Sequence, residues 1–199
     1  DDTSWASANW LPGQNISTWT SFSSDCSATF GCTDSLATNY NPNATTDDGS
    51  CTYQMTYIPD DNFEQTLINL GYDDVLDDYV NTSAISGVQQ LNNSDWVGTI
   101  SDLTGVEDFV SLTSLQADNM EVSQVDISNN IYLENLSIHS NNLTELDLSN
   151  NINLINVIIN DNQIEYINLE NNSFLEWFIA GNNILSSILT LHTYPKLYN

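Results

Sequence analysis

Six oxygen-bearing side chains crowd into one short stretch near the front of the chain. They are Asp34, Asn39, Asn41, Asn43, Asp47 and Asp48. Carboxylate and amide oxygens are the ligands that a hard cation such as Ca2+ prefers, and neutral asparagines limit the repulsion among the carboxylates. The pattern predicts a calcium-binding loop, with a loop rich in Asx turns and without metal as the alternative.

Two cysteines, Cys32 and Cys51, enclose this loop, and Cys26 precedes it. Clustered cysteines favour a local disulfide and an oxidising compartment. We predict a Cys32–Cys51 disulfide that stabilises a unit with little apolar material, worth about 3 kcal/mol in the chain-entropy model. Cys26 is left over, either as a free thiol or bonded to a partner.

The charge balance is extreme, because 27 Asp and Glu face a single basic residue, Lys196. Nucleic acid is excluded as a partner, since neutralising phosphates requires Lys and Arg. No run of about 18 apolar residues exists, so we expect no membrane insertion. With 40% hydrophobic residues the chain is typical of a folded protein. The start at Asp1-Asp2 suggests a processed chain or a fragment.

The second half of the chain repeats itself at 21-residue intervals. The pattern L-x-x-[LVF]-x-[IA] begins at Leu112, Leu133, Leu154 and Leu175. Alternating apolar residues predict short parallel strands, and a fixed period predicts a solenoid with the leucine-rich repeat pattern. The ninth position of three repeats is asparagine, and we expect a ladder of stacked side chains there: Asn141, Asn162 and Asn183. These residues are interpreted as core, without a binding role.

The positions that flank the buried strand residues face outward and define a candidate binding face. In the third and fourth repeats this face carries Asn156, Ile158, Asn160, Trp177 and Ile179. Outward apolar side chains favour an interface, with coverage by the C-terminal tail as the alternative. On the opposite wall Asp126, Asp147 and Asn168 recur at one position and form a solvated acidic flank or a weaker cation site.

Four segments are expected along the chain. Residues 1–25 form an extended arm with three tryptophans, 26–55 the disulfide and calcium-loop module, 56–86 a helical cap, and 87–199 the repeats with an irregular end. In the cap, Asp60 or Asp61 begins a helix that buries Phe63, Leu67 and Leu70 and stops at Gly71. A second short helix or turn follows over 75–80, and the tail from Leu189 either caps the last coil or leaves it open.

Two sequence stretches resemble known families. GCTDSLATNYNPNATTDDGSC, residues 31–51, resembles a module of secreted Bacteroidetes proteins that is similar to thrombospondin type 3 calcium repeats. Residues from about Tyr57 to Leu185 resemble secreted Bacteroidetes leucine-rich proteins, and their first repeats resemble those of internalins. The resemblance implies export by the type IX system and a place at the cell surface.

No arrangement of His139 or His192 with Ser, Cys or Asp at a recognisable spacing indicates catalysis. The predicted protein is therefore not an enzyme. It is an α/β-type leucine-rich repeat solenoid with a parallel sheet, a helical cap and calcium as its cofactor. We expect it to bind a protein or glycan in cell-surface adhesion. The alternative is a structural subunit of an extracellular filament, self-assembled through the arm and the open solenoid end.

Overall fold

A computed structural model describes residues 28–189 and 197–198 and divides the chain into two compact units. The front unit contains Asn39–Cys51 together with the residues up to Ser35, and the second contains Leu36–Thr38 and the chain from Thr52 onward. The predicted tryptophan arm and Cys26 lie outside the described residues. No helix in the described ranges is long and apolar enough to cross a membrane.

The front unit is a small loop closed by the predicted disulfide between Cys32 and Cys51, which confirms that pairing. Cys32 is buried, whereas Phe30 is exposed. Backbone hydrogen bonds are few, and one of them joins Asn41 N–H to the Cys32 carbonyl at 2.9 Å. Because so little apolar surface is buried here, the covalent link is the main stabilising element of the unit.

The cap of the second unit is built on α2 (Asp61–Leu70), which begins after Asp60 and ends at the following glycine with φ 80°. Phe63 and Leu67 are fully buried, as predicted. Leu70 is 39% exposed, so its predicted core position is wrong. The buried face of α2 also includes Glu64 and Thr66. Leu70, the last residue of the helix, lies outside that face.

Asp60 ties this helix to the first coil. Its Oδ1 accepts the N–H groups of Asn62 and Phe63 at 3.0 and 3.1 Å. Its Oδ2 accepts the N–H and hydroxyl of Ser101 and the N–H of Asp102 at 2.8–3.1 Å. Burial by itself raises the pKa of Asp60, but these hydrogen bonds outweigh it and hold the pKa below its ordinary value.

The segment after α2 departs from prediction. The chain turns and then forms β2 (Tyr79–Asn81), which pairs antiparallel with β1 (Met55–Tyr57). The predicted helix over 75–80 is therefore wrong. The alternative prediction, a turn, fits only the residues before β2. Val75 and Leu76 are exposed instead of packing on the core. The short helix of this region is α3 (Thr82–Ile85).

A glycine closes the cap against the first coil. Gly105 has φ 99° and precedes the 3-10 helix η2 (Val106–Asp108). A Cβ at this position would lie 2.3 Å from Ile58 Cδ1 and 2.7 Å from the Tyr57 carbonyl oxygen. The cap strand approaches so closely that only glycine fits here.

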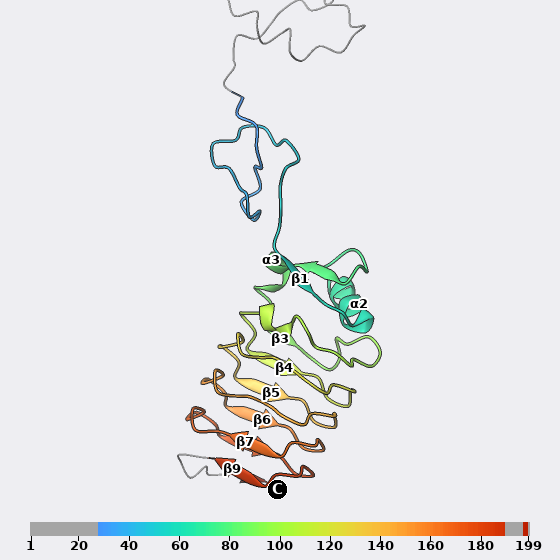
Figure 1. Ribbon diagram of the computed structural model, residues 1–199, viewed down its shortest axis with the longest axis vertical. Coiled ribbons are helices and arrows are strands. Elements are labelled where there is room, and N and C mark those ends of the chain that lie inside the picture. Colours follow the sequence, from blue (N-terminus) through green and yellow to red (C-terminus); the bar gives the residue numbers. More distant parts are fainter. Residues whose placement is uncertain (1–27, 190–196, 199) are drawn as a thin grey trace, which may run out of the picture. The chain divides into compact units, whose positions relative to one another are not determined.

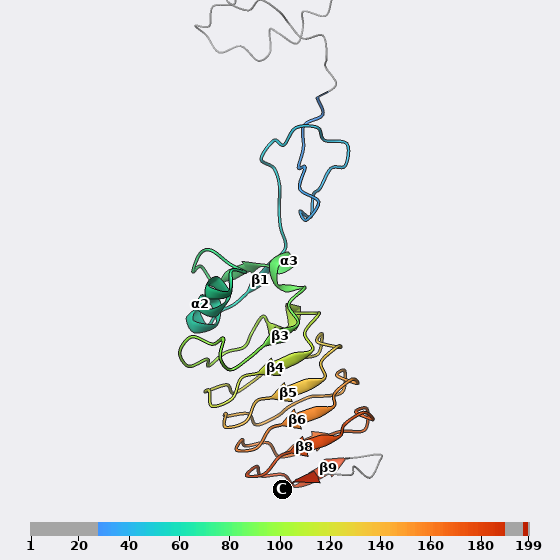
Figure 2. The same ribbon diagram turned by 180° about the vertical axis from the view of Figure 1, so that it is seen from behind.

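The coils stack one on another, and each contributes one short strand to a parallel sheet (Figures 1 and 2). In register, Leu115, Leu136, Val157 and Phe178 stand side by side, which confirms the predicted period. The strands are β3 (Gln90–Leu91), β4 (Ser114–Gln116), β5 (Asn135–Ser137), β6 (Asn156–Ile158), β8 (Trp177–Ile179) and β10 (Leu197–Tyr198). On the opposite wall β7 (Tyr166–Asn168) pairs parallel with β9 (Ser187–Leu189).

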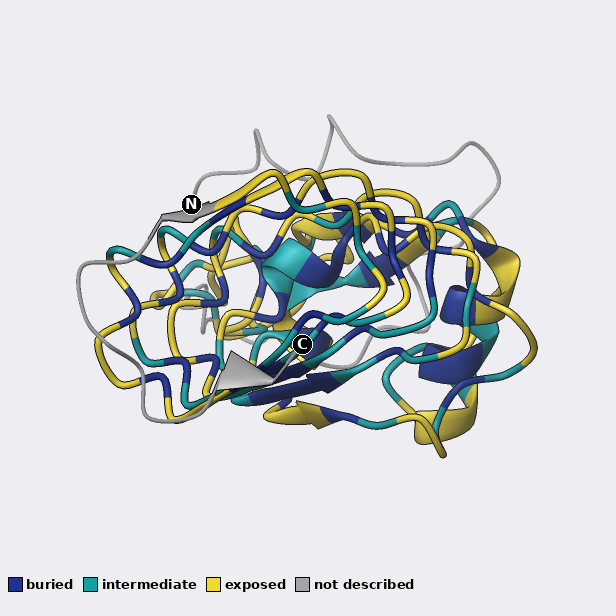
Figure 3. Ribbon diagram, turned by 90° about the horizontal axis from the view of Figure 1, so that it is seen from below, coloured by how far each residue is buried: buried dark blue, intermediate teal, exposed yellow. Residues whose placement is uncertain are grey.

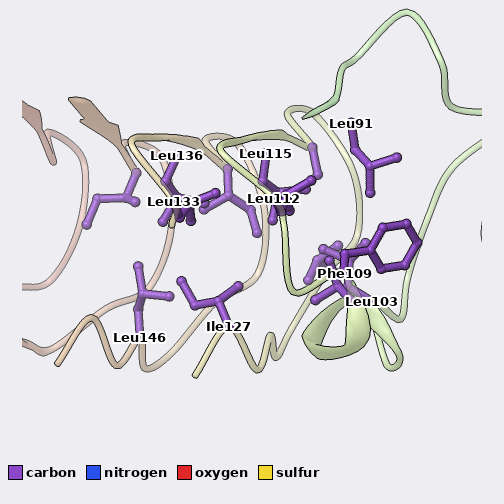
Figure 4. Close-up of a cluster of buried hydrophobic side chains, with 14 of the residues drawn as sticks. Leu91, Leu103, Phe109, Leu112, Leu115, Ile127, Leu133, Leu136 and Leu146 are labelled. Atoms are coloured by element: carbon purple, nitrogen blue, oxygen red, sulfur yellow. The ribbon is translucent and has the colours of Figure 1, made fainter. Parts of the chain in front are cut away.

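Two apolar walls face each other inside the coils. Figure 4 shows Leu112, Leu115, Leu133 and Leu136 on one wall, opposite Ile127 and Leu146. Along each coil, buried residues alternate with intermediate and exposed ones (Figure 3). Since no single coil can enclose both walls, stacking supplies the buried area at about 25 cal/mol per Å2.

Two asparagine ladders satisfy the backbone inside the coils. In the predicted ladder, Asn162 Oδ1 accepts Leu143 N–H at 3.0 Å, and its amide donates to the Ile138 and Ile159 carbonyls at 2.9 and 3.1 Å. The second ladder was not predicted, although it also recurs every 21 residues: Asn130, Asn151 and Asn172, all fully buried. Their amides donate to carbonyls of the preceding coil and hold the turns at that corner.

The tail contributes a strand to the sheet. Leu197 and Tyr198 pair parallel with Phe178 and Ile179, so β10 occupies the place beside β8 that a further repeat would fill. Of the two readings of the tail, this pairing supports a cap. Residues 190–196 lie outside the described part of the chain.

Candidate functional site

The five predicted binding-face residues come together on β6, β8 and the turn after β6. Asn156 stands beside Trp177, and Ile158 beside Ile179. The residues between them, Val157 and Phe178, are buried. Because side chains alternate along a strand, the flanking residues point outward.

The outward side of these two strands carries three apolar side chains and Asn156, whereas the strands of the two coils before it carry only polar ones there. Trp177 is 38% exposed, and Ile158 and Ile179 are half-buried. The equivalent positions of β4 and β5 hold Gln116 and Ser137 in the row of the isoleucines. We name Ile158, Trp177 and Ile179 the concave patch; it is confined to the last two regular coils.

Polar side chains at the patch are fixed by neighbours. Asn156 donates to Asn135 Oδ1 at 2.7 Å. Asn160 donates to Asp161, which also accepts from Asn182 at 2.6 Å. The hydrogen bonds from Asn182 and then Asn160 hold the pKa of Asp161 below its ordinary value, so this exposed carboxylate stays charged beside the patch.

One coil further toward the cap, the structure assembles an arrangement that was not predicted as a site, although the 21-residue period puts Asp118 and His139 at one repeat position. His139 Nε2 lies 3.5 Å from Asp118 Oδ2, and its Nδ1 lies 3.0 Å from Ser140 Oγ. Asp118 and His139 meet because they occupy the same position of adjacent coils. The backbone N–H groups of His139, Ser140 and Asn141 all donate to acceptors within the chain. None of these three N–H groups is therefore available to stabilise an oxyanion.

The predicted calcium ligands are used mainly in turns. Asn41 Oδ1 accepts Asn43 N–H, and Asp47 Oδ1 accepts Gly49 N–H, at 3.0 and 3.1 Å. Asp48 Oδ1 accepts from Ser50 at 3.0 Å, and the hydrogen bonds from Ser50 lower the pKa of Asp48. Asn39 is tied to the same end of the loop, since its amide donates to the Ser50 carbonyl at 2.6 Å.

Asp34 is the sixth predicted ligand and is half-buried. Within the described residues, no three acidic, His or Cys side chains come together as a metal site. A calcium ion in this loop would therefore depend on amide and backbone oxygens as well as carboxylates.

The acidic wall forms a groove of about 800 Å3. Asp126, Asp147 and Asn168 line it at equivalent positions, and Glu145 lies with them. Each of the three uses Oδ1 to accept the N–H two residues ahead, at 2.8–2.9 Å. Hydrogen bonds from Ser128 lower the pKa of Asp126. All three side chains order turns, and the carboxylates of Asp126 and Asp147 are solvent-exposed.

An exposed apolar edge was missed by the sequence analysis. We name it the lateral edge: Val110, Ile131, Tyr132, Ile152 and Phe174, which are 42–63% exposed. The spacing of 21 between Val110, Ile131 and Ile152 was a usable signal, but those residues lie in turns outside the strand pattern. A row of this kind marks a surface for association.

Comparisons with known proteins identify the fold. No model of a protein family matches the sequence, and neither does any curated protein. The functional domain of InlJ from Listeria monocytogenes, which includes a cysteine ladder, superposes with a TM-score of 0.58 at 25% identity. The match covers 67% of this chain and 30% of that one. The chain has a leucine-rich repeat fold.

An internalin of the same organism, InlF, gives a TM-score of 0.52 at 18% identity, over 66% of this chain and 46% of that one. The chain thus spans less than half of either relative. The InlJ domain includes a cysteine ladder, whereas the repeats of this chain contain no cysteine.

Proposed function

We propose that this chain is an extracellular recognition module that binds a protein ligand through the concave patch. One observation carries the proposal: Ile158, Trp177 and Ile179 gather on an outward face that is polar in the neighbouring coils. A half-exposed tryptophan between aliphatic side chains is typical of an interface hot spot. Solenoids of this kind use such extended faces for binding.

The net charge of the chain limits the class of ligand that it can bind. A net charge of −26 and the ionised Asp161 beside the patch favour a ligand with an apolar centre and Lys or Arg around it. Like-charged proteins and phosphate-rich ligands are disfavoured by the same field. The disulfide of the front unit supports a location outside the cell, since such bonds persist in oxidising compartments. Cell-surface adhesion is the task that fits these properties.

The test is a binding screen against extracellular proteins and glycans, followed by two variants. Trp177→Ala should weaken binding at least tenfold and leave the melting temperature within about 2 °C, because the ring is partly solvent-exposed. Phe174→Ala is the matched control, an exposed aromatic of the same coil on the lateral edge. A ligand that Trp177→Ala does not affect, or a variant that unfolds, contradicts the assignment. If only glycans bind in the screen, the ligand is a sugar and the proposal of a protein ligand is wrong.

The lateral edge favours a second candidate, self-assembly into an extracellular filament. Five apolar side chains in a row bury well against a second copy, whereas the charge of −26 opposes contact until cations screen it. Sedimentation in 0.5 M salt with Ca2+ tests this directly. Oligomers that Phe174→Ala abolishes support assembly; a monomer throughout excludes it.

A further inference from the structure

A glutamate is buried in the cap, and the described part of the chain holds no Lys or Arg that could pair with it. Glu64 lies on α2 and is fully buried. Its Oε1 accepts the N–H groups of Asp77 and Tyr79 at 2.8 and 3.2 Å, which directs the carboxyl group into the loop between α2 and β2. Its Oε2 is enclosed by protein and has no hydrogen-bond partner.

A second carboxyl oxygen, in the loop between α2 and β2, is also enclosed without a hydrogen-bond partner among the described residues. Asp73 Oδ1 accepts Asp74 N–H at 2.9 Å, while its Oδ2 is enclosed and has no partner. Two more aspartates, Asp77 and Asp78, follow in the loop. The only Lys or Arg of the sequence is Lys196, more than a hundred residues away along the chain.

An enclosed carboxyl oxygen without a partner is costly in either state. A charged oxygen lacks a donor or cation, and a protonated one lacks an acceptor. Two such carboxyl oxygens, one on α2 and one in the loop that follows it, indicate that each takes its partner from solvent. None of the described residues is a Lys or Arg, so an ion from solvent is the partner that also offsets the charge.

We infer that the loop between α2 and β2 binds a hard cation of the Ca2+ class through Glu64 Oε2 and Asp73 Oδ2. Within the described residues no group of three acidic, His or Cys side chains forms a metal site, so backbone carbonyls and water would complete the coordination. This site is separate from the front loop and independent of the concave patch. It would fix the loop to α2, whose Phe63 and Leu67 close the end of the core.

The experiment is calorimetric melting of the full chain at fixed ionic strength, with Ca2+, with Mg2+ or with a chelator. Saturating Ca2+ should raise the midpoint of the solenoid transition by about 5–10 °C, as expected for a ligand at a hundred times its Kd. Terbium is a direct probe of the ion, because Tyr72 and Tyr79 flank the loop and can sensitise its emission.

Variants show which side chains cause the shift in melting temperature. Glu64→Gln and Asp73→Asn should each remove the shift and the terbium signal of this site. Asp74→Asn removes the same charge from an exposed neighbour and should retain both, and Asp47→Asn reports any contribution of the front loop. Asp73→Asn decides the question if Glu64→Gln fails to fold. No shift in the parent chain, a full shift in Asp73→Asn, or a loss only in Asp47→Asn overturns the inference.

Discussion

Replacing Asn162 by alanine tests the physical basis of the fold, because its side chain makes three hydrogen bonds of 2.9–3.1 Å to backbone groups and a fourth, of 3.4 Å, to the Asn160 carbonyl. Leu143 N–H has Asn162 Oδ1 as its acceptor at 3.0 Å. Left alone inside the coil, that donor costs about 1–3 kcal/mol. The carbonyls of Ile138 and Ile159 lose one bond each, worth about 0.5–1.5 kcal/mol, but keep donors from Asn141 and Asn183.

The sum is about 2–6 kcal/mol, a large share of the stability of an ordinary domain. Urea unfolding measures it, and a loss of about 4 kcal/mol lowers the midpoint by roughly 2 M. Asn142→Ala is the control, since Asn142 is exposed and makes one long contact to the Glu121 carbonyl at 3.4 Å. That variant should stay within about 0.5 kcal/mol of the parent.

The last ladder asparagine is less buried than Asn162, and this difference provides a second test. Asn183 makes equivalent bonds, with its Oδ1 accepting Ile164 N–H at 3.0 Å, but it is only half-buried. Water can reach the groups that Asn183→Ala leaves, so its cost should be smaller than that of Asn162→Ala. Equal and small losses for Asn162→Ala and Asn142→Ala would refute the view that the ladder satisfies the buried backbone.

Three further changes have defined outcomes. Asp60 has a lowered pKa, so its contribution is complete above its unfolded value of about 3.8 and is lost as pH falls through the folded pKa. Between pH 5 and 2.5 the melting temperature of Asp60→Asn should therefore fall less steeply than that of the parent; parallel curves would exclude this role. Gly105→Ala should cost about 2–5 kcal/mol in urea unfolding from strain and overlap, whereas Gly71→Ala, with free space around its Cβ, should cost about 1. In hydrogen exchange, Ca2+ should slow residues 39–51 of the parent and not of Asp47→Asn; identical exchange with a chelator would leave a metal-free loop.

Several elements were predictable because their signals are local or periodic. The helix 61–70 is framed by a capping aspartate and a glycine in adjacent sequence. Leu133, Leu154 and Leu175 occupy equivalent buried sites because the 21-residue spacing imposes the register of every coil. The candidate binding face follows from the same alternation, which assigns each strand residue to the inside or the outside.

Other features were decided by contacts between distant residues. Residues 79–81 form a strand because they pair with the edge of β1, which lies more than twenty residues earlier in the chain. No local sequence pattern indicates this pairing. Asp118 and His139 become neighbours only when two coils stack.

What the sequence by itself determined is the repeating unit, its inner and outer faces, and the covalent closure of the front loop. The tertiary structure alone decided which polar groups are enclosed, as for Glu64. The physical reason is that periodicity fixes the direction of a side chain within its own coil, whereas its burial and partners depend on what the next segment covers.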